Sequence, residues 1–306
     1  MKLIQYTDFI PAESFVATVG FFDGLHLGHR FLLERLKAEA AREGKKTLVI
    51  SFAVHPQTVL KNNYLPKLLT TNAEKIELLN DVGIDACVLL PFDEEMMNLS
   101  AYDFLEKIIK KQLGVSALLI GYDHRFGKNR EEGFPQYVEY GKQLGINILP
   151  VEAFENGEAH ISSSYIRKLL LSGQIEEANY CLGRRYRLNG KVVDGEKLGR
   201  EIGFPTANLN IDPQKLLPEA GVYAVWVRVN GKVYKGMLNI GCRPTVNRTN
   251  RTTVEVHILD FIGEIYGEML EIDFVRKIRN EQKFNSMEEL TVQLEKDKLE
   301  IEKSNI

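Results

Sequence analysis

The sequence predicts two domains: an α/β domain with a parallel sheet, followed by a small antiparallel β-barrel with a terminal helix. In the first half, apolar strand-like runs alternate with amphipathic helical segments, which is typical of a parallel sheet with helices on its faces. In the second half, short strand-like runs follow one another with tight turns, as in a small closed barrel. A length of 306 residues fits two domains at about 150 residues each. We place the boundary after residue 184, which predicts domains 1–184 and 185–306.

The composition is that of an ordinary globular protein and predicts no nucleic-acid or membrane partner. Hydrophobic residues make up 44% and charged residues 26%, and the formal net charge of −3 gives no reason to expect nucleic-acid binding. No apolar run approaches the ~18 residues that cross a bilayer, and the first residues lack the apolar core of a signal peptide. The three cysteines are scattered and form no Cys-x-x-Cys pair, which favours reduced thiols. We therefore expect a cytoplasmic protein, and we expect it to be a monomer or a weak homo-oligomer.

Five strand-like runs and the helical segments between them define the first domain. The runs are residues 15–19, 47–52, 86–90, 117–120 and 146–151. A helix over 31–43 ends at Gly44, a second opens with the capping pair Thr71 and Glu74, and a third runs from Ser100 to about residue 113. In a parallel sheet the carboxyl ends of the strands share one edge, and ligands bind beyond that edge. The loops that follow the strands are therefore the candidate sites.

The stretch 18–29, TVGFFDGLHLGH, follows the first strand and opens a helix. Its glycine-rich turn leaves unpaired backbone N–H groups and the positive end of the helix dipole in one place, which suits a phosphate. His26 and His29 are three residues apart and share one face of the first helical turn, and Gly28 leaves that face open to a ligand. Two histidines near a turn are by themselves more often ordinary surface residues. A metal site is disfavoured because no cysteine or third histidine lies nearby.

Two further segments offer polar groups at the same edge. The loop 121–133, GYDHRFGKNREEG, follows the fourth strand and is either a charged surface loop or a substrate contact. The segment 161–167, ISSSYIR, puts three serines at a helix start with Arg167 one turn on. One serine is enough for a helix cap, so three serines and an arginine indicate a phosphate site. His55, after the second strand, is equally consistent with a ligand role and with an ordinary turn.

The second domain is expected to consist of short strands and one terminal helix. The strands are predicted at residues 186–193, 222–229, 233–240, 252–259 and 269–274. Asn230-Gly231 between two of them is a strong hairpin signal. A final helix opens with the capping pair Ser286 and Glu289 and runs to about residue 303.

Two polar segments of this domain are candidates for a site. Residues 195–208, GEKLGREIGFPTAN, predict a glycine-rich flap, after which Thr206 and Asn208 point their oxygens to one side of an extended chain. Such oxygens suit Mg²⁺, although spacing alone favours a simple turn. Glu255 and His257 share one face of a strand, where a carboxylate inside a barrel is costly unless it has a function, and a solvated one is ordinary. No Gly-x-x-x-x-Gly-Lys-(Ser/Thr) loop occurs, which excludes an ordinary P-loop kinase.

Taken together, the motifs resemble those of the bacterial bifunctional riboflavin kinase/FAD synthetases. Gly-x-Phe-Asp-Gly-x-His-x-Gly-His, the Gly-x-Asp-x-x-Phe-Gly loop and Ile-Ser-Ser-Ser-x-x-Arg resemble the FAD synthetase module. Gly-Phe-Pro-Thr-Ala-Asn, Asn-x-Gly-x-Arg-Pro-Thr and Val-Glu-x-His-x-x-Asp-Phe with a trailing Tyr-Gly are similar to the riboflavin kinase domain. The motifs occur in order over nearly the whole chain. Phe21, His124 and Ser164 depart from the family's usual residues, and none of these changes removes a phosphate-binding group.

For the first domain, the resemblance implies a Rossmann-like nucleotidylyltransferase that adenylylates FMN to FAD with ATP and releases pyrophosphate. His26, His29 and Arg167 would promote the transfer. The implied ATP-binding residues are Gly20, Phe22, Asp23, Gly24, His26, Gly28, His29, Ser162, Ser163, Ser164 and Arg167. The implied FMN or substrate loop contributes Asp123, Arg125, Phe126 and Gly127.

For the second domain, the resemblance implies a kinase that phosphorylates riboflavin to FMN with ATP. Glu255 would be the general base, and Thr206 and Asn208 would hold Mg²⁺ with ATP. The implied ATP and flavin residues are Gly199, Gly203, Phe204, Pro205, Thr206, Asn208, Asn239 and Glu255. Two alternatives remain: a single-activity nucleotidylyltransferase with a flavin-sensing regulatory barrel, and a non-catalytic flavin-binding protein.

Overall fold

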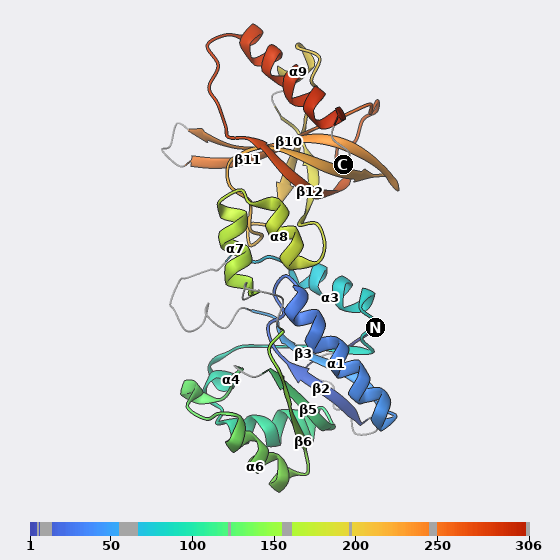
Figure 1. The fold of residues 1–306 in the computed structure, drawn as a ribbon, viewed down its shortest axis with the longest axis vertical. Coiled ribbons are helices and arrows are strands. Elements are labelled where there is room, and N and C mark those ends of the chain that lie inside the picture. Colours follow the sequence, from blue (N-terminus) through green and yellow to red (C-terminus); the bar gives the residue numbers. More distant parts are fainter. Residues whose placement is uncertain are drawn as a thin grey trace. The chain divides into compact units, whose positions relative to one another are not determined.

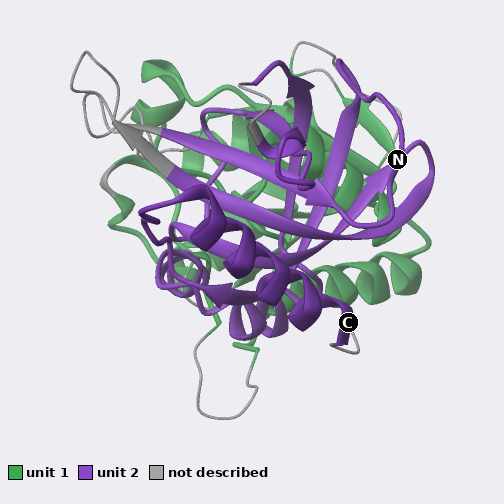
Figure 2. Ribbon diagram, turned by 90° about the horizontal axis from the view of Figure 1, so that it is seen from above, with its two compact units in different colours: residues 1–163 green, residues 164–306 purple. Residues whose placement is uncertain are grey.

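The computed structural model describes residues 1–4, 6, 14–54, 67–121, 124–154, 161–195, 198–244 and 250–303. Contacts divide the chain into two compact units, residues 1–163 and 164–306 (Figure 2). The first unit holds a parallel sheet and the second a closed antiparallel barrel, so the predicted fold class is confirmed. Helix α8 (Ile175–Leu182) and nearly all of α7 (Ser163–Leu171) belong to the second unit by their contacts. The division of the two activities after residue 184 stays a prediction.

The first unit is built on a six-stranded parallel sheet, drawn in blue to green in Figure 1. Its strand order is β1-β4-β3-β2-β5-β6. Its strands are β1 (Lys2–Ile4), β2 (Phe15–Val19), β3 (Lys46–Phe52), β4 (Ala86–Leu90), β5 (Val115–Gly121) and β6 (Asn147–Val151). Its helices are α1 (Leu27–Glu43), α3 (Asn72–Asp81), α4 (Glu94–Asn98), α5 (Ala101–Asp103), the π-helix η1 (Phe104–Gln112), the short 3₁₀ turn η2 (Lys128–Arg130) and α6 (Phe134–Leu144). The five predicted strands are confirmed. β1 is an additional edge strand, which was not predicted because three residues are too few to show a strand pattern.

Apolar side chains on both faces of the sheet explain why these strands form. β2 is buried along its whole length and pairs with β3 on one side and β5 on the other. Leu33 and Leu36 of α1 pack into the core on one face, and Phe104 and Ile109 of η1 pack into the core on the other. Strands buried on both faces appear in a sequence as continuous apolar runs, which is why they were predictable.

The predicted helix ends are confirmed where the capping residue lies within a few positions of the helix end in the sequence. Gly44 ends α1 in the left-handed conformation (φ 63°), and Thr71 and Glu74 form the expected capping box at the start of α3. The Ser100 hydroxyl accepts a hydrogen bond from the Asp103 N–H at the start of the third helix (3.0 Å). Most of that helix is the π-helix η1, which the sequence pattern did not predict.

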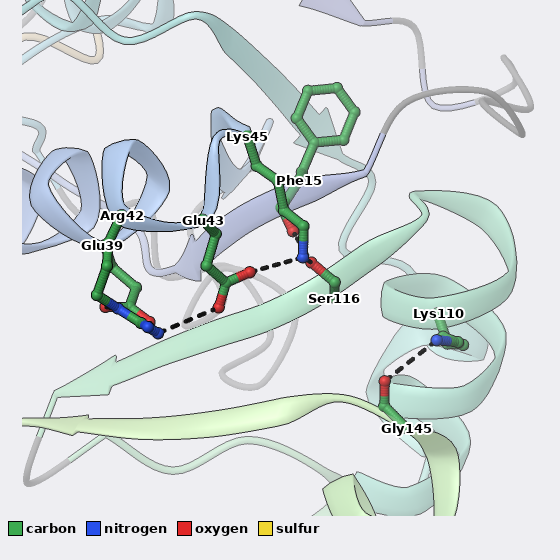
Figure 3. A network of polar contacts seen from close by, with 8 residues as sticks. All are labelled: Phe15, Glu39, Arg42, Glu43, Lys45, Lys110, Ser116 and Gly145. Atoms are coloured by element: carbon green, nitrogen blue, oxygen red, sulfur yellow. Dashed lines mark hydrogen bonds and ion pairs between the residues drawn. The ribbon is translucent and has the colours of Figure 1, made fainter.

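A polar network fixes the C-terminal end of α1 at the amino ends of β2 and β5. The Lys45 ammonium donates to Glu43 (2.6 Å) and to the Ser116 hydroxyl (2.7 Å), which in turn donates to the Phe15 carbonyl (3.1 Å; Figure 3). Because α1 runs antiparallel to these strands, its N-terminus lies at their carboxyl ends. That edge is where ligands bind in parallel α/β sheets.

The second unit contains a closed barrel, drawn in yellow to orange-red in Figure 1. Its strand order is β10-β11-β8-β7-β12-β9. Its elements are β7 (Arg187–Val193), η3 (Leu198–Arg200), β8 (Ala207–Ile211), β9 (Gly221–Val229), β10 (Lys232–Pro244), β11 (Asn250–Ile258), β12 (Met269–Arg279) and helix α9 (Met287–Lys303). The five predicted strands are confirmed, and β8 is the sixth that closes the barrel. Asn230 and Gly231 both have positive φ (48° and 74°), as the predicted two-residue hairpin requires.

Helix α9 is attached to the barrel by apolar and ionic contacts. Ile301 is fully buried in the core and Leu294 packs against it. The Arg279 guanidinium of β12 binds the Asp297 carboxylate of α9 at 2.9 Å, and Asp297 is only 2% exposed. In the described part of the chain, no helix is both long and apolar enough to cross a membrane.

Candidate active sites

The first candidate site is the histidine turn, which we define as residues 20–29 between β2 and the first turn of α1. Its backbone is strained: Phe22 and Leu25 have φ of 53° and 41°, and Gly24 has φ of 80°. Non-glycine residues in this region cost about 1–3 kcal/mol each, and such strain concentrates at functional sites. The Gly20 N–H donates to the Ile50 carbonyl (3.0 Å), which continues the sheet up to the turn.

The two imidazoles of the turn are stacked on each other. The ring centroids of His26 and His29 lie 3.7 Å apart, and the His29 N–H of the backbone donates to His26 Nδ1 (3.4 Å). An added Cβ at Gly28 would lie 3.3 Å from the His26 ring, so a larger residue would press on this pair. The sequence prediction that both imidazoles share one face is confirmed.

His29 carries a buried polar atom that the protein does not satisfy. Its Nδ1 has no hydrogen-bond partner in the described structure, and its ring packs edge-on against Phe22 (5.2 Å). Burial, followed by the nearby charges of His26 and Lys75, holds the pKa of His29 well below its usual range. His29 is therefore neutral near pH 7, with an unsatisfied ring nitrogen at the turn.

Asp23 has a positioning role in the structure. Its carboxylate accepts hydrogen bonds from the Leu69 N–H (3.1 Å), the Thr70 N–H (2.9 Å) and the Thr70 hydroxyl (3.2 Å). The Gly24 N–H donates to the same hydroxyl (3.0 Å). These bonds tie the histidine turn to the segment before α3, a contact between distant parts of the sequence.

The serine segment meets the histidine turn at its first residues. The Ser163 hydroxyl donates to the Asp23 carbonyl (2.9 Å), and the Ile161 carbonyl lies 3.9 Å from the position of a Cβ on Gly28. Ser164 and Arg167 lie on α7 and belong to the second unit, so their part in this site stays a prediction.

The loop after β5 is held in place by aromatic packing. Phe126 stacks on Tyr137 of α6 (4.1 Å), whose hydroxyl contacts the Phe126 backbone N and O, both at 3.1 Å. Gly127 has φ of 87°, and a Cβ there would lie 2.6 Å from the Ala101 backbone N. Phe126 thus supports the loop from the core side, while Arg125 is exposed. Asp123 and His55 lie outside the described residues.

The second candidate site is a row of polar side chains across three neighbouring barrel strands. In the strand register, Glu255 of β11 lies opposite Asn208 of β8 and opposite Asn239 of β10. Cross-strand partners point to the same face of a sheet. The Thr206 hydroxyl lies 3.5 Å from Glu255 Oε2 as a hydrogen-bond donor. The structure therefore brings together four predicted residues that are up to 49 positions apart in the sequence.

Two pockets meet at Thr206. One, of about 310 Å³, is lined by Glu255, Asn239 and apolar side chains of α9, including Met287 and Leu290. The other, of about 80 Å³, shares Thr206 with the first and is lined by residues that include Arg200, Phe261 and Tyr266. Thr206 thus lines both a larger pocket of mixed apolar and charged side chains and a smaller pocket with aromatic groups and Arg200.

The glycine-rich flap is shaped by close backbone contacts. A Cβ at Gly199 would lie 2.2 Å from the Phe204 carbonyl oxygen, and a Cβ at Gly195 would lie 2.0 Å from Asn208 Nδ2. Gly203 has φ of 81°. Gly199 is required because the flap folds tightly against its own backbone, and Gly203 is favoured by its left-handed conformation.

His257 is a further residue of this site, for which the sequence pattern indicated a shared face with Glu255 but no role. Its Nδ1 donates to the Pro205 carbonyl (2.8 Å), since a carbonyl can only accept. Its ring lies 5.2 Å from that of Phe204. Burial is the main cause that lowers the pKa of His257. The pattern Glu-x-His in the sequence indicated its place in the site, because residues two apart on a strand lie on the same face of the sheet.

The donor set near Thr206 fits a phosphate-bound Mg²⁺ better than an all-protein metal site. Thr206 and Asn208 supply neutral oxygens, and Mg²⁺ bound to nucleotides takes few protein ligands and keeps phosphate and water oxygens. Among the residues that the structure describes, no group of three or more His, Cys, Asp or Glu side chains could hold a metal ion.

Comparison with known proteins agrees with this two-site arrangement. Residues 10–165 match the family model described as FAD synthetase, and residues 182–305 match that of riboflavin kinase. The bifunctional riboflavin kinase/FMN adenylyltransferase of Bacillus subtilis is 38% identical over 93% of this chain and 90% of its own length. That of Escherichia coli K12 is 38% identical over 94% and 92%. A solved structure titled macrolide-efflux protein from Streptococcus pneumoniae superimposes over the whole of both chains with a TM-score of 0.91 and 28% identity.

Proposed function

The chain belongs to the family of bifunctional riboflavin kinases/FMN adenylyltransferases, and from this premise we propose which residues perform each reaction. The enzyme phosphorylates riboflavin to FMN with ATP and adenylylates FMN to FAD with a second ATP. The observation that carries the assignment is that the polar row of the barrel and the histidine turn are two separate constellations in two separate units.

In the kinase step, Glu255 is the general base. The ribityl 5′-hydroxyl of riboflavin gives its proton to Glu255, its oxygen bonds to the γ-phosphorus of ATP, and ADP leaves. The apolar side chains of the 310 Å³ pocket suit the flat flavin ring, and the smaller pocket with Arg200 and Tyr266 suits a part of ATP. Thr206 lies where the two pockets meet, which is where the phosphoryl group passes. Mg²⁺, held by Thr206 and Asn208, would neutralise charge on the ATP phosphates.

In the adenylyl-transfer step, no general base is needed, because the FMN phosphate is already ionised near pH 7. A phosphate oxygen of FMN bonds to the α-phosphorus of ATP, and pyrophosphate leaves. The imidazoles of His26 and His29 and the N–H groups at the start of α1 stabilise the phosphates. Ser162, Ser163 and Ser164 with Arg167 add donors to the same anion. The loop with Asp123, Arg125, Phe126 and Gly127 positions FMN.

Product analysis with single variants tests the two-site assignment. Riboflavin or FMN is incubated with ATP and Mg²⁺, and the flavins are separated by chromatography. E255A is expected to lose FMN formation about a hundred-fold or more and still convert FMN to FAD. H29A is expected to form FMN at the wild-type rate and to lose FAD formation. Equal loss of both activities in either variant contradicts the assignment, and a wild-type enzyme that leaves riboflavin unchanged would favour a flavin-sensing barrel.

We also propose the finer conditions under which the enzyme works. Mg²⁺ is the divalent ion, and the cytoplasm is the compartment, supported by Cys87 and Cys181, which are buried free thiols in the structure. The protein acts as a monomer or weak homo-oligomer without a nucleic-acid or membrane partner, supported by its net charge of −3.

A further inference from the structure

A buried cation lies directly beneath the histidine turn. Lys75 of α3 is 0% exposed, and its ammonium lies 4.0 Å from the centroid of the Phe21 ring. The ammonium donates to the Ser51 hydroxyl at the end of β3 (3.2 Å), and that hydroxyl donates to the Phe21 carbonyl (3.1 Å). A chain of hydrogen bonds thus runs from the Lys75 ammonium to the backbone of the turn.

Within the described ranges of the chain, Lys75 forms no ion pair. Burial lowers the pKa of Lys75 to about 8, and the nearby Asp23 carboxylate opposes this shift, so the side chain is still mostly an ammonium at pH 7. The Asp23 carboxylate itself is hydrogen-bonded to Leu69 and Thr70. The Ser51 hydroxyl and the Phe21 ring replace only a small part of the hydration that the ammonium loses on burial. Such burial lowers the stability of the fold, which suggests that the charge has a function.

The charge of Lys75 reaches the predicted ATP site. Its ammonium is one of the causes that hold the pKa of His29 low, which means that its field acts on the imidazole of the turn. A field that disfavours a proton on His29 favours negative charge at the same place. The ligand expected there is the triphosphate of ATP, whose charge shifts onto pyrophosphate as the α-phosphorus is attacked.

We propose that Lys75 is a positioning residue for adenylyl transfer: its buried ammonium, held by Ser51 and the Phe21 ring, supplies fixed positive potential behind the turn that binds the ATP phosphates. It acts without leaving the protein interior, so no water has to be displaced from it when ATP binds. The inference rests on the proposed function of the histidine turn. If Lys75 only filled space, an apolar side chain of the same length would fill it without the cost of a buried charge.

The test compares K75M, K75R and K142M in the full-length enzyme. Methionine keeps the length of the side chain and removes the charge, arginine keeps the charge, and Lys142 is an exposed lysine on α6 of the same unit. In K75M, kcat/KM for ATP in FAD formation is expected to fall about ten- to a hundred-fold, which is the scale of one buried charge acting over several ångströms. Product inhibition by inorganic pyrophosphate is expected to weaken. K75R is expected to restore most of the activity, and K142M to match the wild type.

The kinase reaction and the melting temperature separate this proposal from a structural role. Riboflavin phosphorylation by K75M is expected to be unchanged, and its melting temperature is expected to stay near that of the wild type, because the lost attraction to the nearby Asp23 carboxylate is offset by the removal of a desolvated charge. Wild-type FAD kinetics in K75M, or an equal defect in K75M and K75R, would overturn the proposal. If K75M does not fold, S51A decides: a raised KM for ATP in FAD formation supports the proposal, and an unchanged KM overturns it. A wild-type enzyme that makes no FAD from FMN would instead refute the proposed function.

Discussion

The histidine turn and the polar row of the barrel, which we propose as the two phosphate sites, are built by different means. The turn is made by the backbone of ten consecutive residues, with strained φ angles, a helix N-terminus and two imidazoles, of which that of His26 is buried and that of His29 partly buried. The barrel row is made by side chains of Asn208, Glu255 and Asn239, which are brought side by side by strand register. Substitutions in a site made by backbone are expected to lower the stability of its unit as well as its activity. Substitutions of side chains on a sheet can remove activity while the fold is kept.

The largest effect is expected for a change that removes only chemistry. E255Q keeps the shape of the side chain and removes the base, so riboflavin phosphorylation is expected to fall at least about a hundred-fold. The melting temperature is expected to stay within a degree or two, because Glu255 is partly exposed and the amide keeps a hydrogen-bond acceptor for Thr206. Steady-state assays and thermal melts measure the two quantities.

The matched control for E255Q is E268Q, the same change at an exposed position in the barrel unit. It is expected to leave both activities unchanged. A large loss of stability in E255Q would show that the polar row also stabilises the barrel, and the contrast between the two sites would then not hold.

In the histidine turn, the replacement of a single heavy atom is expected to lower both stability and activity. D23N places an amide N–H₂ against the backbone N–H of Leu69 or Thr70. Two donors then face each other in the interior, and neither has an acceptor. The first unit is expected to lose about 1–3 kcal/mol of unfolding free energy, and FAD formation is expected to fall while FMN formation from riboflavin is kept. Denaturant unfolding and product analysis measure this.

The control for D23N is D81N, the same substitution at an exposed position on α3. It is expected to be neutral in both measurements. If D23N lowers FAD formation without lowering stability, Asp23 contacts substrate directly and the turn is less dependent on its backbone than the structure indicates.

The contrast between the two sites also explains what the sequence could predict. The histidine turn was predictable because its parts are consecutive, and the fold class was predictable because apolar periodicity reports which faces are buried. The role of Asp23 was not, since its partners at residues 69–70 lie far away in the sequence. The meeting of Asn208, Glu255 and Asn239 depends on strand register, which short strands do not reveal. A single lysine in a helix appears in a sequence as a surface residue, so the burial of Lys75 required coordinates.

A pH effect of intermediate size is expected for the first unit. Because the pKa of His29 is held well below its unfolded value of about 6.5, the folded protein keeps the imidazole neutral while the unfolded chain takes up a proton. Stability is therefore expected to fall by about 1 kcal/mol per pH unit as the pH drops below about 6.5, and to be unaffected by this group above it. H29Q removes the titrating ring, and melts between pH 5 and 7.5 should show a flatter dependence in this variant. An unchanged slope would place the proton uptake on another group.

The smallest effect is expected for the hydrogen bond between His257 of the barrel wall and the flap. H257F keeps an aromatic ring against Phe204 and removes the Nδ1 donor to the Pro205 carbonyl. One hydrogen bond contributes about 1 kcal/mol, which corresponds to a several-fold rise in KM for the kinase substrates. Because Pro205 itself is exposed, its carbonyl can bind water instead, and the melting temperature should change little. An unchanged KM would mean that the flap is held by its own glycine turns, and a change in FAD formation from FMN would mean that the two sites are not independent.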